Sequence, residues 1–325
     1  MTLADWVALG MLWWKGGGRA AIVRWLVEPE GAARIGEGPH ATLDAMVAAS
    51  DPGLAASGRL TRARAAAHAA LETADAAGIV AVPWSDTRYP TALAAIADPP
   101  PVLWVRGDPD ALGGASTVVI VGSRAGSAYA RDVGRELGSG LAERGITVVS
   151  GLARGVDSAA HRGALAVDGC TVGVLGSGVD IVYPPEHSGL ARDVIRRGAL
   201  VSELPPGTTP RPAYFPQRNR LISGLSLAVV VVEASRRSGS LITARLALEQ
   251  GREVMAVPGN VSLAGTVAPT PCSRTVQRLS RMWTISWKRS GRSGRRVGTH
   301  VPVRSSRRTR CCGRCLGARA TTWMI

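Results

Sequence analysis

The sequence lacks acidic residues between residues 264 and 325, although it holds 24 of them in all. The same stretch contains 14 of the 39 basic residues and four of the five cysteines, Cys272, Cys311, Cys312 and Cys315. Residues 1–263 keep 25 basic against 24 acidic residues, so this part is almost neutral. The chain therefore divides into a near-neutral body, long enough for two domains with a hydrophobic core, and a basic tail of different composition.

Long apolar runs are also missing. No run reaches the ~18 residues that a membrane-spanning helix needs. The N-terminus offers Asp5 and the short stretch VALGMLWW but no basic start, so it does not predict a signal peptide. We expect a cytoplasmic protein that does not enter a membrane.

Motifs of common enzyme classes are absent as well. A dinucleotide site needs G-x-G-x-x-G and an acidic residue about 20 positions further on, whereas here the turn reads GSRAGSAYA and the next strand ends in VVSG. The sequence has no Walker motif, catalytic triad or H-E-x-x-H motif, and His161 is expected to pack on a helix face. We predict no enzyme, no cofactor and no metal. The alternative is a nucleotide-binding hydrolase of the lysine-decarboxylase-like type, although SRRSGSLITA lacks the PGGxGT turn of those proteins.

Apolar strands alternate with helices from residue 79 onward. Strands are expected at GIVAVPW, VLWVRG, STVVIVG, GITVVSG, CTVGVLG, ALVSEL, LAVVVVEA and EVMAVPG, with helices between most of them. Near-continuous apolar strands separated by helices are typical of a parallel sheet covered on both faces. We predict a Rossmann-like, doubly wound, mainly parallel α/β domain over residues 76–263. Residues 1–75 are predicted to form a small helical packing domain, with a nucleic-acid-binding hairpin as the other interpretation.

The carboxyl ends of parallel strands meet at one edge of a sheet, where ligands bind. Small residues follow the strands there, and they let backbone N–H groups approach an oxyanion at a helix N-terminus. The candidates among them are Gly122, Ser123, Ser150, Gly151, Ser238 and Gly239. The same edge is predicted to hold seven arginines, Arg124, Arg154, Arg211, Arg218, Arg220, Arg236 and Arg237.

Few acidic residues are available in the sequence to pair with these arginines. Only Glu203 and Glu233 are expected at the edge, so the pattern predicts a phosphate-binding site, while plain ion pairs stay open for one or two arginines. Tyr214 and Phe215 precede Arg218, Asn219 and Arg220 in YFPQRNR. Bases stack on aromatic rings while arginines follow the phosphate backbone, so we expect single-stranded nucleic acid as the ligand.

Six stretches together resemble the DNA-processing protein A (DprA/Smf) family. They are VVIVGSR, VVSGLARGVDSAAHRGAL, VGVLGSGVDIVYPPEH, VSELPPG, FPQRNRLISGLS and VVVVEASRRSGSLITARLALEQGREVMAVPGN, and they fall in order between residues 79 and 260. The helical N-terminal part resembles the sterile-alpha-motif or helix-hairpin-helix module of that family less closely.

The resemblance implies a protein of natural transformation that binds and protects single-stranded DNA, loads the RecA recombinase and works as a homodimer, without catalysis. DNA contacts carry over to Arg124, Phe215, Arg218 and Arg220. Where the family has a basic residue three positions before the aromatic one, this chain has Pro212, with Arg211 one position further back.

The basic tail departs from the family pattern. Cys312 and Cys315 form a C-x-x-C pair that could hold zinc with Cys272, Cys311 or His300, and a basic nucleic-acid-binding tail is a second interpretation. A third is a frameshift between about Gly259 and Gly265. In the shifted frame, Met282–Trp283 becomes Val, Trp283–Thr284 becomes Asp and Trp287–Lys288 becomes Glu, whichever codons are used. We predict that residues 264–325 are out of frame and disordered.

Overall fold

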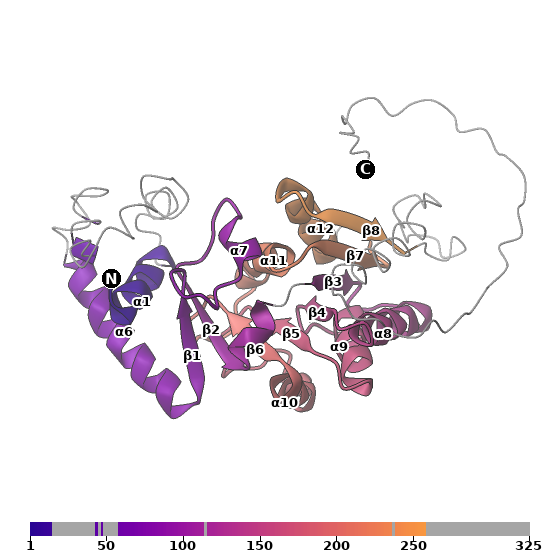
Figure 1. Ribbon diagram of the computed structural model, residues 1–325, viewed down its shortest axis with the longest axis horizontal. Helices are drawn as coiled ribbons and strands as arrows, with labels where there is room; N and C mark the ends of the chain where they lie inside the picture. The colour runs from indigo at the N-terminus through magenta and orange to yellow at the C-terminus, as the bar shows by residue number, and fades with distance from the viewer. Residues whose placement is uncertain (15–42, 45–46, 48–57, 114–115, 236–237, 258–325) are drawn as a thin grey trace, which may run out of the picture.

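The computed structural model describes residues 1–14, 43–44, 47, 58–113, 116–235 and 238–257. Within these residues eight strands form one sheet in the order β1-β2-β6-β5-β4-β3-β7-β8 (Figure 1). The strands are β1 (Ile79–Pro83), β2 (Val102–Gly107), β3 (Thr117–Gly122), β4 (Thr147–Ser150), β5 (Thr171–Val174), β6 (Ala199–Ser202), β7 (Ala228–Val232) and β8 (Glu253–Ala256). All eight predicted strands are present.

Six of the strands, β3 to β8, pair in parallel, which confirms the mainly parallel sheet. Strand β2 runs the other way, because it pairs antiparallel with β6, where Trp104 faces Ser202. Strand β1 pairs antiparallel with β2 and therefore points in the same direction as the six parallel strands. The strand predicted over residues 102–107 is therefore an antiparallel extension of the sheet and not a member of its parallel part.

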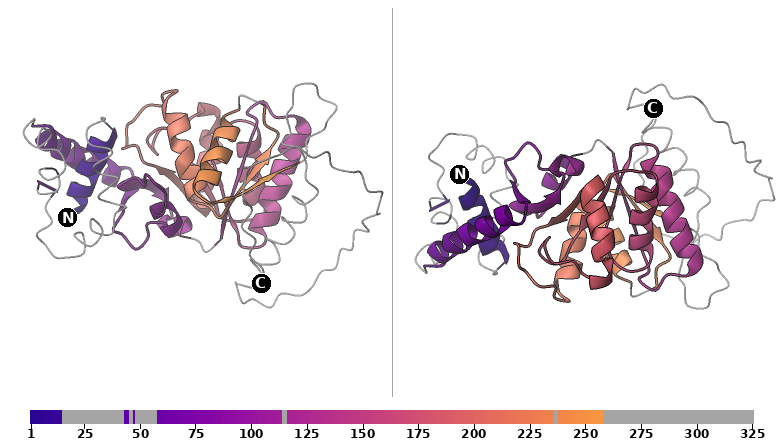
Figure 2. Two further views of the ribbon diagram at one scale, coloured as in Figure 1. Left: turned by 90° about the horizontal axis from the view of Figure 1, so that it is seen from above. Right: turned by 90° about the horizontal axis from the view of Figure 1, so that it is seen from below.

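Helices cover both faces of the sheet (Figure 1). One face carries α8 (Ala128–Ala142), α9 (Val156–Ala166) and α10 (Ser188–Arg197), and the other carries α7 (Thr91–Ala94), α11 (Tyr214–Gly224) and α12 (Gly239–Glu249). The two turned views separate these layers and show α11 and α12 side by side (Figure 2).

Alternating side chains of each strand reach the two helix layers, as the two-residue period of a strand requires. Val119 and Val121 of β3 belong to the core under α11, whereas Val118 and Ile120 belong to the core under α8 and α9. The predicted doubly wound α/β fold is confirmed.

The N-terminal helices pack against the antiparallel end of the sheet. Helix α1 (Leu3–Trp14) lies on α6 (Arg59–Ala76), and the Trp6 ring lies 6.4 Å from that of Trp84, which follows β1. One hydrophobic cluster contains Trp6, Leu60 and Trp104. Because this core is shared, the domain limits of 1–75 and 76–263 stay a prediction. Residues 15–42 of the predicted helical domain lie outside the described residues.

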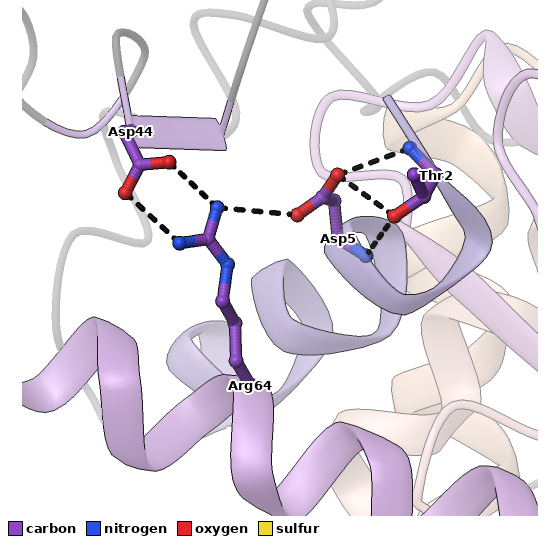
Figure 3. Close-up of polar contacts among 4 residues, drawn as sticks. All are labelled: Thr2, Asp5, Asp44 and Arg64. Carbon is purple, nitrogen blue, oxygen red and sulfur yellow. Dashed lines mark hydrogen bonds and ion pairs between the residues drawn. The ribbon is translucent and has the colours of Figure 1, made fainter.

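Arg64 of α6 ties this end of the molecule together (Figure 3). Its guanidinium donates to both carboxylate oxygens of Asp44, at 3.0 and 2.7 Å, and to Asp5 of α1 at 3.3 Å. Thr2 donates its backbone N–H to the same Asp5 carboxylate at 3.0 Å. Helix α6 is thus anchored to α1. In the described part of the chain, no helix has the length and apolarity needed to cross a membrane.

Candidate functional site

The strand order changes direction at β3. The chain passes from β3 through β4 and β5 to β6 on one side, and then returns to place β7 and β8 on the other side. Connections therefore leave the carboxyl ends of β3 and β7 in opposite directions, which opens a crevice between them. A pocket of about 480 Å³ lies there, and its lining includes Gly122, Ser123, Arg124, Arg218, Asn219, Ser238 and Gly239.

Helices α8, α9 and α12 follow β3, β4 and β7 at this edge, and the N-termini of α8 and α9 are already occupied. The α8 terminus is filled by Glu233, which accepts from Ser127 N–H at 3.0 Å and from the Ser127 hydroxyl at 2.5 Å. At the α9 terminus, Val156 N–H donates to the Ser123 carbonyl at 3.3 Å, and Asp157 lies in the first turn. Glu233 therefore caps a helix here, a role that the sequence pattern did not indicate.

The N-terminus of α12 faces the pocket. Ser238 caps this helix by accepting from Ser240 N–H at 3.3 Å, and Ser238, Gly239 and Ser240 all line the pocket. A helix N-terminus carries partial positive charge and favours an anion. The hydroxyl groups, the helix end and the nearby arginines together suit a phosphate group.

Arg218 forms part of the pocket wall and is 5% exposed. Its Nη1 donates to the Gly151 carbonyl at 2.9 Å and to the Val174 carbonyl, so it joins α11 to the ends of β4 and β5. Burial lowers the pKa of Arg218 to about 10, with Asp157 opposing that shift. Arg218 is thus still charged at neutral pH. A Cβ atom on Gly151 would lie 2.7 Å from its Nη1, so a larger residue at this position would displace the guanidinium.

Asp157 is an acidic neighbour that the sequence pattern did not single out. It is 7% exposed and accepts from Gly151 N–H at 3.1 Å. Burial raises the pKa of Asp157, while the Arg218 guanidinium acts in the opposite direction. The charge on Arg218 is therefore partly balanced from within the protein.

Arg124 extends the site toward an aromatic pair. This exposed residue follows β3, and its guanidinium carbon lies 5.8 Å from the centre of the Phe215 ring. Arg218 lies over the same ring at 5.9 Å, and Phe215 packs on Tyr183 with 5.3 Å between ring centres. A smaller pocket of about 40 Å³ is lined by Arg124, Arg218, Phe215 and Tyr183, so the two arginines line both pockets.

Phe215 packs on Tyr183, which is distant in the sequence. Tyr214 lies beside Arg211, whose guanidinium carbon is 5.9 Å from the Tyr214 ring, whereas Tyr183 contacts Phe215. Tyr183 was not predicted as a site residue, although the segment GSGVDIVYPPEH that contains it leaves β5 at the same edge of the sheet. Position after a strand end is therefore the signal that could have found it.

Arg220 lines neither pocket, unlike Arg124 and Arg218. It takes the ion-pair arrangement that the sequence left open for one or two of the arginines. Its Nε donates to Asp98 at 2.9 Å and its Nη2 to Glu203 at 2.5 Å. Burial acts to lower the pKa of Arg220, but Glu203 and Asp98 outweigh it and raise the pKa. Two positions along a helix differ by about 200° around its axis, which directs Arg220 away from Arg218.

The remaining predicted residues take several positions. Arg154 lines the smaller pocket and pairs with Glu186 at 2.5 Å, and Asn219 donates to the Gly239 carbonyl at 3.3 Å. Ser150 is buried, and its hydroxyl donates to the Ile120 carbonyl at 2.6 Å, so it holds two strands together. Arg211 is exposed beside Tyr214. Arg236 and Arg237 lie outside the described residues.

His161 packs in the core, as predicted. It is fully buried, its Nδ1 lies 2.7 Å from the Thr171 hydroxyl, and burial lowers its pKa to about 3. No cluster of three or more histidine, cysteine or acidic side chains suited to a metal occurs in the part of the chain that the structure describes. The zinc interpretation concerned Cys272, Cys311, Cys312, Cys315 and His300, which lie outside it.

A family model and two known proteins that match this chain all point to the same family. The family model for DNA recombination-mediator protein A matches residues 81–278. Protein Smf of Escherichia coli is 48% identical over 189 residues, which is 58% of this chain and 50% of that protein. The DNA processing protein DprA of Bacillus subtilis is 42% identical over 207 residues, which is 64% of this chain and 69% of that protein. The chain thus spans only half the length of the E. coli relative.

Solved structures agree. The X-ray structure of DNA processing protein A from Streptococcus pneumoniae superposes with a TM-score of 0.69 at 31% identity, covering 86% of this chain and 93% of that one. The structure of DNA processing protein A from Helicobacter pylori, which is described by its single-stranded DNA binding mode, superposes with a TM-score of 0.52 at 27% identity. This match covers 63% of this chain and 88% of that one.

The family match includes the whole parallel sheet and both pockets, and it ends at residue 278, within the segment that we interpret as out of frame. The chain therefore belongs to the DNA recombination-mediator protein A family, also named DprA or Smf.

Proposed function

We propose that this protein binds single-stranded DNA along the groove formed by the larger and the smaller pocket. The observation that carries the proposal is the position of Arg124, which lines both pockets and lies 5.8 Å from the Phe215 ring. An exposed guanidinium between the larger pocket and an aromatic ring can contact a phosphate while the neighbouring base stacks on the ring.

Each pocket suits one part of a nucleotide. In the larger pocket, the N-terminus of α12 and Arg218 would receive a phosphate. In the smaller pocket, Phe215 and the 41%-exposed Tyr183 offer aromatic surface to a base. Bases of a duplex are already stacked and paired, so an aromatic ring at this position favours a single strand.

Relatives support the same ligand class, because the H. pylori protein of this fold is described by its single-stranded DNA binding mode. On family membership we further propose that the protein protects incoming DNA, loads the RecA recombinase and forms a homodimer. Sedimentation of the full chain tests the dimer, and RecA strand exchange on protein-coated single strands tests the loading.

Arg124→Ala in the full chain tests the groove. We expect affinity for a fluorescent oligothymidylate to fall by about 1.5–3 kcal/mol, the range for a hydrogen bond to a charged group. The slope of log K against log salt should decrease by about 0.7, the value for one phosphate contact on a single strand. Arg192→Ala removes the same charge from an exposed position on α10 outside both pockets and should change neither quantity.

Competition with a mononucleotide separates the proposal from a nucleotide-binding hydrolase. The oligonucleotide should bind far more tightly, because it engages both pockets at once. Equal affinity for a mononucleotide, with release of a hydrolysis product, would favour the hydrolase.

A further inference from the structure

We propose that Arg220, Asp98 and Glu203 form a buried clamp that positions α11, and with it Phe215 and Arg218, over the DNA-binding groove. The inference rests on the proposed binding of single-stranded DNA. It assigns Arg220 an indirect role: a positioning residue that does not touch the strand.

The clamp joins three separate segments of the chain. Asp98 lies between α7 and β2, Glu203 follows β6, and Arg220 lies in the middle of α11. The side chains of Arg220 and Glu203 are 7% and 2% exposed, and that of Asp98 is 32% exposed. The guanidinium thus bridges two carboxylates at 2.9 and 2.5 Å in a mostly buried site.

The second half of α11 has further anchors. Gln250 donates to the Arg220 carbonyl at 3.1 Å, and Arg252 donates to the Gly224 carbonyl at 3.2 Å and to Ala92 at 2.6 Å. At its other end, α11 has no side-chain hydrogen bond at the N-cap Ala213. Phe215 lies about 7.5 Å along the helix axis from Arg220, at 1.5 Å per residue. A helix moves as a rigid unit over this length, so the clamp sets where the Phe215 ring lies.

The clamp and the groove differ in how their arginine charges are balanced. Arg220 faces two carboxylates, so its positive charge is compensated within the protein. A DNA phosphate approaching it would also approach Asp98 and Glu203, which repel an anion. Arg124, by contrast, is exposed and lines both pockets. Weakening the clamp should therefore lower affinity without removing a phosphate contact.

Asp98→Asn in the full chain is the main test, because Asp98 is partly exposed and its loss leaves Glu203 paired with Arg220. We expect affinity for oligothymidylate to fall about three- to tenfold, within the range of coupling between linked residues, with an unchanged salt slope. Asp44→Asn is the matched control, since it weakens the Arg64 ion pair at the far end of the molecule (Figure 3). A salt slope reduced by about 0.7 would make the clamp a direct phosphate contact and overturn the proposal.

A double-mutant cycle distinguishes positioning from general destabilisation. Phe215→Ala should weaken binding less in the Asp98→Asn background than in the wild type, because a misplaced ring has less contact to lose. Arg220→Gln combined with Glu203→Gln replaces the buried ion pair by two neutral side chains and leaves a charge only on the partly exposed Asp98, and it should show the same reduced effect. Additive losses in both backgrounds, with proteins that are folded by circular dichroism, would overturn the clamp. Wild-type protein that fails to bind the oligonucleotide would instead overturn the proposed function.

Discussion

At the scale of single residues, three arginines near one helix differ in role because they differ in burial. Arg124 is exposed at the groove, Arg218 is buried in the pocket wall, and Arg220 is buried between two carboxylates. The residue type is the same in each case. What the guanidinium can contact depends on which groups surround it.

Arg218→Ala should destabilise the fold as well as weaken binding. The Gly151 and Val174 carbonyls would each lose a buried donor, at about 1–3 kcal/mol for a group left unsatisfied. Urea unfolding measures the loss. Arg124→Ala serves as the comparison and should stay within about 0.5 kcal/mol of wild type, as exposed substitutions usually do. Equal stability of the two variants would show that Arg218 does not hold the strand ends.

Phe215→Ala should weaken binding of single strands by about 1–3 kcal/mol, the range for one base stacked on an aromatic ring. The ring is only partly buried, so the melting temperature should change little. Tyr129→Ala removes a 50%-exposed aromatic ring of α8 that lines neither pocket, and it should leave binding unchanged. A Phe215→Ala protein that unfolds, yet binds normally whenever folded, would make Phe215 a core residue.

At the scale of elements, His161 links α9 to β5 in its neutral form. The Thr171 hydroxyl donates to the Val148 carbonyl at 2.7 Å, so it accepts from the N–H of His161 Nδ1. The other ring nitrogen, Nε2, is buried without a hydrogen-bond partner. Protonation would place a second N–H there with nothing to accept it, which agrees with a pKa lowered to about 3 by burial.

Stability should therefore fall as the pH drops below 6.5. The unfolded chain gains a proton on His161 there while the folded chain does not, so the free energy of unfolding decreases by about 1.4 kcal/mol in all between pH 7.5 and 5.5. Urea unfolding at pH 7.5, 6.5 and 5.5 measures this decrease in the free energy of unfolding. These pH values lie above the range in which most carboxyl groups titrate. His161→Gln cannot titrate and should remove this part of the slope. A wild-type slope no steeper than that of the variant would contradict a neutral His161.

At the scale of the whole molecule, charge is the unevenly distributed quantity. Residues 1–263 are nearly neutral, and residues 264–325 hold 14 basic and no acidic residues. Arginine attracts phosphate whatever the origin of the segment, so we expect the tail to add sequence-independent affinity for any nucleic acid. Deleting residues 264–325 should reduce binding to duplex DNA and its salt dependence while the preference for single strands persists. Loss of that preference would place part of the specific site in the tail.

The origin of the tail stays a prediction, since these residues lie outside the described part of the chain. The nucleotide sequence around codon 260 should show an insertion or deletion that restores the family reading frame. Trypsin should trim the chain to near residue 264 and stop. A trypsin-resistant tail, or one that binds zinc stoichiometrically, would contradict the frameshift and favour the zinc site.

Order along the chain was enough to predict the eight strands and the mainly parallel α/β sheet, because a buried strand needs a continuous apolar run and a helix a longer amphipathic one. The six motifs also predicted the family, because their order and spacing can be read from the sequence alone. The same logic placed Gly122, Ser123, Arg124, Ser238 and Gly239 near one pocket, because the carboxyl ends of parallel strands share an edge.

Only the tertiary structure decided which charged side chains are paired within the protein and which can contact a ligand. Asp98 and Asp157 lie 122 and 61 residues before the arginines that they accompany, Arg220 and Arg218, and no local pattern brings them together. The antiparallel direction of β2, the contact of Tyr183 with Phe215 and the capping of α8 by Glu233 likewise depend on packing between distant segments. Strand and helix periods are local properties of the chain, whereas the pairing of a buried charge is settled where separate elements meet.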